Sequence, residues 1–317
     1  MAERPGGVGR AWWKAVQFIL ALGVIGLAVR ALAKNWDAFR AQPIHWTPSP
    51  LWLLTSLALV WVTYAVLIEG WRWVVISLCQ RLRYVEAARI CMLSNLAKYI
   101  PGKVWSFAGV AALASGAGVE RSAAIVSAIV LPALSFASAI VVLSFTAPHS
   151  LSSTTPALAI ASISVGAVGL LAVAVLSWPR ALRGIQRLLP RSVPTLIPIP
   201  PGIMIAAFAA NVVAWAGYGA AFVCLGRGLL PDVPLTWYQA TTVFVTSFLV
   251  GSVAVFAPAG IGPRESTFVL LLTGPFGPKI AVALALAHRV LMTIAEVGGA
   301  LPFLIAGRRL PRVDSLD

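Results

Sequence analysis

Charged residues are scarce in this 317-residue chain, and acidic residues are the scarcest. Only 11% of the residues are Asp, Glu, Lys or Arg, against about a quarter in soluble globular domains. Because 59% of the residues are hydrophobic, the composition argues against a water-soluble globule and excludes a disordered chain. The length instead accommodates several membrane spans of about 20 residues each, joined by short connections.

The chain also has few groups for metal or redox chemistry. Its three cysteines, Cys79, Cys91 and Cys224, form no CxxC pair, and its three histidines are scattered. The sequence therefore predicts neither a metal site nor a disulfide framework, and we expect no cofactor. The 24 Lys and Arg residues lie between apolar runs rather than on a soluble face. This distribution indicates orientation in a membrane and argues against a nucleic-acid partner.

Six apolar runs are long enough to cross a membrane. They cover residues 12–33, 51–78, 122–146, 156–177, 202–226 and 280–306. Basic residues gather in alternate connections, and the opposite loops hold only Lys34, Arg40 and Arg227. Since basic loops mark the cytoplasmic side, we predict a multi-pass protein of the cytoplasmic (inner) membrane with both termini cytoplasmic. The first run is longer than a usual signal core, which favours an uncleaved anchor.

Two further apolar segments, 86–117 and 238–274, are each interrupted near the centre by Pro and Gly. The interruptions read Ile-Pro-Gly-Lys at 100–103 and Ala-Pro-Ala-Gly-Ile-Gly-Pro at 257–263. A single crossing by either segment would disturb the alternation of basic loops. Each is therefore predicted to be a re-entrant hairpin or two short spans. Non-helical backbone at membrane depth needs cover from protein or from a wet cavity.

The order of span, hairpin and span occurs twice in what we predict to be a single all-α transmembrane domain, 1–317. Residues 51–146 form the first unit and residues 202–306 the second. By the distribution of basic residues, the first unit starts outside and the second inside, so the two are inverted. Inverted repeats with broken helices are typical of transporters, with the substrate site at their interface. Two hairpins of independent origin are the alternative, and the matching order makes it the weaker one.

The two interruptions also carry a family resemblance. Ala-Pro-Ala-Gly-Ile-Gly-Pro-Arg-Glu at 257–265, followed by a helix with Arg289, resembles the transmembrane domain of the lysylphosphatidylglycerol synthetase/flippase family. The first hairpin, from Asn95 to Lys103, is similar to that family's earlier Asn…Pro-Gly-Arg motif. Trp105 and Ser106 depart from the family pattern, and the soluble aminoacyltransferase domain is absent. The resemblance implies a stand-alone, non-enzymatic membrane domain that moves or handles lipid-linked substrates.

Charged residues at membrane depth mark a candidate site, since each costs about 2.5–3.5 kcal/mol on insertion scales. Pro263 suits the first turn of a helix, whose free N–H groups and dipole attract anions. Arg264 adds a full charge there, and Glu265 either caps the helix or balances Arg264. The predicted site for an anionic headgroup comprises Lys98, Pro101, Gly102, Lys103, Gly260, Gly262, Arg264, Glu265, Arg289 and Glu296.

Three other features have simpler interpretations. Glu69 and Arg72 are spaced to pair locally on one helix, and His288 is interpreted as a packed residue. Arg289 and Glu296 share a helix face. Structural packing and substrate contact are equally supported as the role of this pair. The segment 178–201 carries Arg180, Arg183, Arg187 and Arg191 on one face, which predicts a basic amphipathic linker on the cytoplasmic membrane surface.

Three functions follow as hypotheses. The first is a flippase or transporter for an anionic phospholipid or a polyprenyl-phosphate-linked substrate. The second is a non-transporting partner of a glycosyltransferase or lipid synthase. The third, a membrane-embedded lipid transferase, is disfavoured because the intramembrane acids are few and separated. The expected partners are anionic membrane lipids or a lipid-linked glycan, together with a glycosyltransferase or lipid synthase under the second hypothesis.

Overall fold

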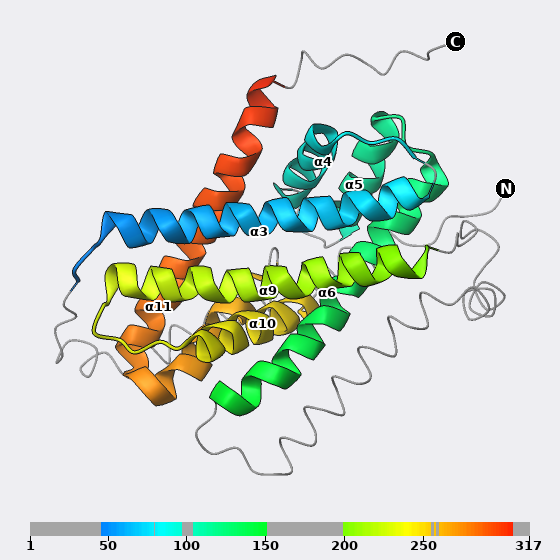
Figure 1. Cartoon of the computed structure of the whole chain (residues 1–317). Coiled ribbons are helices and arrows are strands. Elements are labelled where there is room, and N and C mark those ends of the chain that lie inside the picture. The colour runs from blue at the N-terminus through cyan, green and yellow to red at the C-terminus, as the bar shows by residue number, and fades with distance from the viewer. Residues whose placement is uncertain are drawn as a thin grey trace, which may run out of the picture.

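The computed structural model describes residues 46–78, 80–96, 104–150, 199–254, 257 and 260–306. Their regular structure is helical throughout (Figure 1). The helices are α3 (Pro50–Ser77), α4 (Tyr84–Leu96), α5 (Val104–Gly116), α6 (Arg121–Ser150), α9 (Pro201–Leu229), α10 (Trp237–Val253) and α11 (Pro263–Ala306). The predicted spans 12–33 and 156–177, the linker up to residue 198, and Lys98 through Lys103 lie outside the described residues.

Four of the described helices are long and apolar enough to cross a membrane. They are α3, α6, α9 and α11, and they correspond to the predicted spans 51–78, 122–146, 202–226 and 280–306. Three of them, α3, α9 and α11, begin with a proline, which lacks the N–H that would find no partner in a first turn. An all-helical fold is confirmed for the part of the chain that the structure describes.

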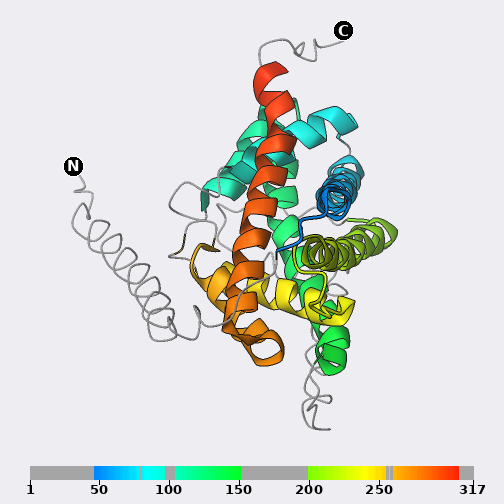
Figure 2. The same cartoon turned by 90° about the vertical axis from the view of Figure 1, so that its left-hand side faces the viewer.

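Helices α3 and α9 lie side by side and antiparallel, as Figures 1 and 2 show. Small residues bring their backbones together, since a Cβ at Gly70 would lie 3.0 Å from the Cβ of Ala210. The Ser56 hydroxyl also donates to the Ala221 carbonyl across the interface, at 2.7 Å. Apolar surface drives little association in a membrane, so close packing and interhelical hydrogen bonds hold this pair together.

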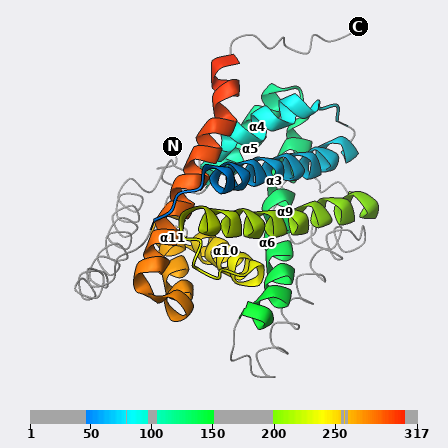
Figure 3. The same cartoon turned by 60° about the vertical axis from the view of Figure 1, so that its left-hand side comes forward.

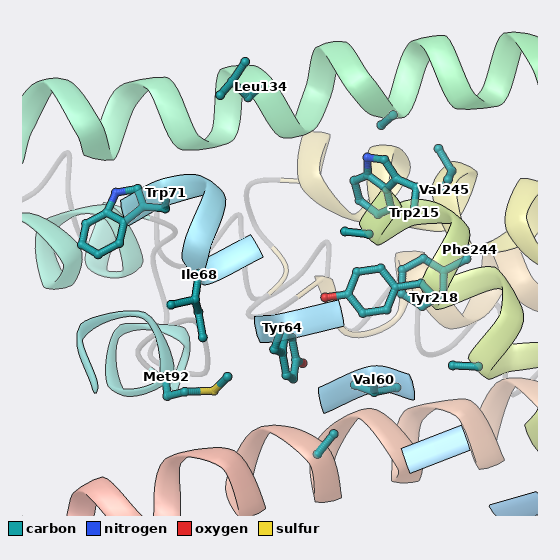
Figure 4. Packing of buried hydrophobic residues seen from close by; sticks show 14 of the residues in the cluster. Val60, Tyr64, Ile68, Trp71, Met92, Leu134, Trp215, Tyr218, Phe244 and Val245 are labelled. Carbon is teal, nitrogen blue, oxygen red and sulfur yellow. The ribbon is translucent and has the colours of Figure 1, made fainter. Parts of the chain in front are cut away.

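Helices α6 and α11 cross this pair steeply. In Figure 2, α3 and α9 are seen nearly end-on while α11 runs across them. Helix α6 packs on α9 and α10, and α11 packs on α4 and α10. Buried hydrogen bonds join α6 to its neighbours, among them Trp215 Nε1–H to Ser138 Oγ at 2.9 Å. Figure 4 shows Tyr218 and Phe244 face to face beside Trp215 in the core that these helices share.

Helix α11 is folded back on itself at Gly277. This residue has φ 81° and ψ 160° and interrupts the helix between Pro275 and Pro278. Predicted hairpin 238–274 thus consists of α10, the break and the first part of α11, and predicted span 280–306 is the second part. Long α3, short α4, short α5 and long α6 follow one another in the described chain, and long α9, short α10, and a short and a long part of α11 repeat this order. The inversion of the two units in the membrane stays a prediction.

Candidate functional site

The break before α11 is built on glycine backbone conformations. Gly260 has φ 70° and Gly262 has φ 93°, values that residues with a Cβ rarely adopt. Helix α11 then begins at Pro263, as its sequence predicts, and Ser266 N–H donates to the Gly262 carbonyl at 2.8 Å. The two glycines therefore let the chain turn sharply into the helix that carries Arg264.

Arg264 lies in a slot between two glycines. A Cβ at Gly251 would lie 2.9 Å from Arg264 Nε and 3.1 Å from its Cδ, and one at Gly260 would lie 3.2 Å from its Cγ and Nε. Gly251 belongs to α10 and Gly260 to the break, so the arginine stem joins the two arms of the hairpin. Its guanidinium carbon lies 5.4 Å from the ring centre of Phe248, within cation–π range.

The Arg264 guanidinium is incompletely paired. The side chain is half-buried, and its Nε is buried without a hydrogen-bond partner among the described residues. An unsatisfied charged donor in a low-dielectric setting costs more than a neutral one. The slot therefore fixes the arginine stem at the break and leaves a buried N–H of the guanidinium unpaired among the described residues.

Glu265 caps the helix that it begins. Its Oε2 accepts the Gly262 N–H at 2.8 Å, and its Oε1 lies 3.5 Å from Arg289 Nη1. Of the two predicted roles, capping is confirmed, and the ion pair that this carboxylate makes is with Arg289. Because the two residues are 24 positions apart (289 − 265), a straight helix would separate them by about 36 Å. The fold at Gly277 brings them together.

Glu296 is buried, with a relative exposure of 3%. The Tyr64 hydroxyl donates to its Oε1 at 3.4 Å. The charge of Glu296 interacts with that of Arg264, as do the charges of Arg289 and Glu265. Arg264, Glu265, Arg289 and Glu296 thus form one electrostatic cluster, although they come from both sides of Gly277.

His288 packs as predicted. Its ring stacks on Phe268 with centres 4.5 Å apart and meets Phe222 and Phe244 edge to face. The buried Nε2 has no hydrogen-bond partner among the described residues. Three aromatic neighbours suit a neutral imidazole in an apolar core.

The structure brings together six of the ten predicted site residues. These are Gly260, Gly262, Arg264, Glu265, Arg289 and Glu296. Lys98, Pro101, Gly102 and Lys103 lie outside the described residues, so a joint site with the first hairpin stays a prediction. Sequence reasoning missed Gly251 and Tyr64. A lone glycine near the end of α10 does signal a close approach, but a tyrosine in an apolar helix carries no comparable signal.

The chain can now be compared with known families. The family described as the lysylphosphatidylglycerol synthase transmembrane region matches residues 14–297. The chain belongs to this family. The match spans both hairpins and confirms the resemblance seen at their motifs, and no curated protein matches the chain significantly. Family membership and the four long apolar helices make it a multi-pass membrane protein with a lipid-related role. In the synthases, the matched region is the membrane part and not the catalytic part.

Proposed function

We propose that the protein moves an anionic phospholipid or a polyprenyl-phosphate-linked substrate between the leaflets of the cytoplasmic membrane. The Arg264 slot is the observation that carries this proposal. A half-buried guanidinium, whose Nε–H is unpaired among the described residues, lies at the start of a helix, next to a break between two apolar helices. Phosphate is the chemical group that suits a helix N-terminus and an arginine fork together.

The neighbouring charges suit transient binding. Glu296 and Glu265 offset the charges of Arg264 and Arg289. An entering phosphate competes with these carboxylates for the guanidinium groups and leaves again without stranding an unpaired cation. Lys98 and Lys103 of the first hairpin are proposed to approach the same headgroup.

The packing of the two units supports alternating access. The last long helix of each unit contacts the short helix of the other, α6 with α10 and α11 with α4. Antiparallel α3 and α9 lie between them (Figure 1). In an inverted repeat, rocking of one unit against the other exposes a central site to each leaflet in turn.

Reconstitution of the full chain in liposomes tests the proposal. Fluorescent phosphatidylglycerol, lysylphosphatidylglycerol and a polyprenyl phosphate would be compared, with leaflet exchange read by an impermeant quencher. We expect one class to exchange faster than in protein-free vesicles and in vesicles with Arg264→Ala. If no class exchanges, the protein is instead a non-transporting partner of a lipid enzyme. In intact cells, Asp232→Cys should react with an impermeant thiol reagent and Arg187→Cys only after lysis, in a background without native cysteines.

A further inference from the structure

A second hollow lies away from the Arg264 slot, where α3, α4 and the last turns of α11 meet. Figure 3 shows α4 beside the C-terminal part of α11, with α3 across them. The groove has a volume of about 320 Å³, and its walls include Trp61, Ile68, Tyr84, Met92, Gly298 and Phe303. These walls are hydrocarbon, sulfur, aromatic ring or bare glycine backbone.

A hydrogen bond and close helix packing fix the residues that line the groove. Trp61 Nε1–H donates to the Ala295 carbonyl at 3.1 Å, which anchors the indole of α3 on α11. Gly298 and Gly299 let α3 and α4 approach closely, since a Cβ at Gly299 would lie 3.0 Å from Met92 Sδ. A hollow with anchored walls binds a flexible chain without a large cost of ordering the protein.

The surroundings of the groove are a membrane. Helices α3 and α11 have the length and composition of spans, and Trp61 of the groove lining is 43% exposed. Lipid acyl chains surround such a surface, and a flexible acyl chain can follow the shape of the groove. A hydrocarbon chain of a lipid is therefore the occupant that matches the lining.

Basic residues lie at one end of the groove. There, Tyr84 directly follows Arg81 and Arg83, both of which are exposed. Glu86 of α4 also lies at this end, where it accepts the Arg83 backbone N–H at 2.8 Å. The side chains of Arg81 and Arg83 attract an anionic headgroup to this end, because each basic residue near a membrane surface contributes about 1 kcal/mol of attraction to anionic lipid.

We propose that this groove binds one hydrocarbon chain of an anionic phospholipid, with the headgroup at Arg81 and Arg83. The site is separate from the Arg264 slot. It rests on the protein lying in a membrane and does not depend on leaflet exchange. Its role is to hold a lipid against α3, α4 and α11 from the side on which the α3–α4 connection lies.

Photo-crosslinking of the full-length protein in vesicles tests this site. The probes are phosphatidylglycerol and phosphatidylcholine with a diazirine in one acyl chain, and adducts are located by peptide mass spectrometry. We expect adducts to concentrate on the peptides that contain Met92 and Phe303. The Ala65→Leu substitution fills the groove from α3. It should lower these adducts about tenfold, the factor expected when roughly two methylene groups lose their contact.

Ala58→Leu is the matched control, because Ala58 is exposed on the same helix and is not part of the groove lining. It should leave the adducts unchanged. The double variant Arg81→Gln/Arg83→Gln should remove the preference for phosphatidylglycerol over phosphatidylcholine, a change of about thirtyfold, and should leave phosphatidylcholine adducts as they were.

Several results would overturn the proposal. One is labelling that is as dense around exposed Ile205 of α9 as in the groove, because that pattern describes annular lipid. Another is equal labelling of the wild type and Ala65→Leu. A third is a Met92→Cys cross-link to another part of the chain or to a second copy without lipid adducts, because protein then fills the groove. Leaflet exchange in the same vesicles reports separately on the Arg264 slot.

Discussion

Two arginines of this protein lie in apolar surroundings beside a glutamate, but the hydrogen bonding of their guanidinium groups differs. Arg72 donates from Nη1 to Glu69 at 2.7 Å and from Nε to the Leu82 carbonyl at 2.9 Å. Arg264 also has a glutamate close to it in the sequence, the adjacent Glu265. Its Nε nevertheless has no hydrogen-bond partner among the described residues.

The difference arises from helix geometry. Residues three apart lie on one face of a helix, whereas adjacent residues point about 100° apart and do not meet. Glu265 therefore turns to the Gly262 N–H and to Arg289, and Arg264 enters the glycine slot instead. The comparison shows that local hydrogen bonds fix Arg72, whereas packing of its stem between two glycines fixes Arg264.

The largest effect is expected from Arg264→Ala. Loss of a charge-assisted hydrogen bond of about 1.5–3 kcal/mol should reduce lipid exchange by about ten- to a hundredfold, with membrane abundance largely kept. Arg264→Lys should be impaired to a lesser degree, because it keeps the charge and loses the fork.

Arg72→Ala is the counterpart, and it should leave exchange per folded molecule unchanged. The contrast between the two arginines is wrong if the rate of lipid exchange is proportional to the amount of protein in the membrane for every variant, including Arg264→Ala/Glu265→Gln. Both arginines would then be structural.

Gly251→Ala should give the next largest effect. The added methyl group collides with the Arg264 stem, so we expect a loss of about 1–3 kcal/mol in the free energy of unfolding together with reduced exchange. Gly251→Ala/Arg264→Ala should recover the stability, since no stem remains to collide with, but not the exchange. Thermal unfolding in detergent and a double-mutant cycle measure this coupling.

Gly116→Ala is the control for that cycle, because a Cβ there meets nothing within 4 Å. If Gly251→Ala is as harmless as Gly116→Ala, the slot does not confine the arginine.

Glu265→Ala should cost about 1 kcal/mol, the usual contribution of a helix cap. Glu265→Gln should cost less, since its amide oxygen still accepts the Gly262 N–H while the ion pair with Arg289 is lost. The melting temperatures of the two variants separate capping from pairing. Equal losses would mean that the charge, and not the cap, is what stabilises the break.

The smallest effect is expected at the structural pair. Glu69→Gln should cost only about 0.2–1 kcal/mol, because the pair is partly exposed and such pairs contribute little. Arg72→Gln should cost more, since it also loses the bond to the Leu82 carbonyl. The melting temperature and the lipid exchange rate are measured for both variants. A lower exchange rate per folded molecule in Glu69→Gln or Arg72→Gln would remove the contrast with Arg264.

Local properties of this protein could be predicted from its residues. The ends of α3 and α9 at 50–77 and 201–229 lie close to the predicted spans 51–78 and 202–226, because the length of an apolar run is a local quantity. The start of α11 at Pro263 and the pairing of Glu69 with Arg72 follow from rules that reach no further than one helical turn.

Contacts between residues far apart in the sequence could not be predicted, because they depend on the fold of the chain. Gly251 meets Arg264 only because α10 and α11 pack together across the break, and Tyr64 reaches Glu296 only because α3 lies against α11. Neither contact has a fixed spacing in sequence that a pattern can reveal.

The sequence by itself determined that this is a helical membrane protein with Pro-Gly breaks, cations at those breaks and a family motif to match. Apolar length and backbone preference act within single segments, so they are readable there. Only the tertiary structure decided which carboxylate faces Arg289 and where the groove between α3, α4 and α11 lies. Both depend on the fold at Gly277, which returns α11 alongside its own beginning and against α4.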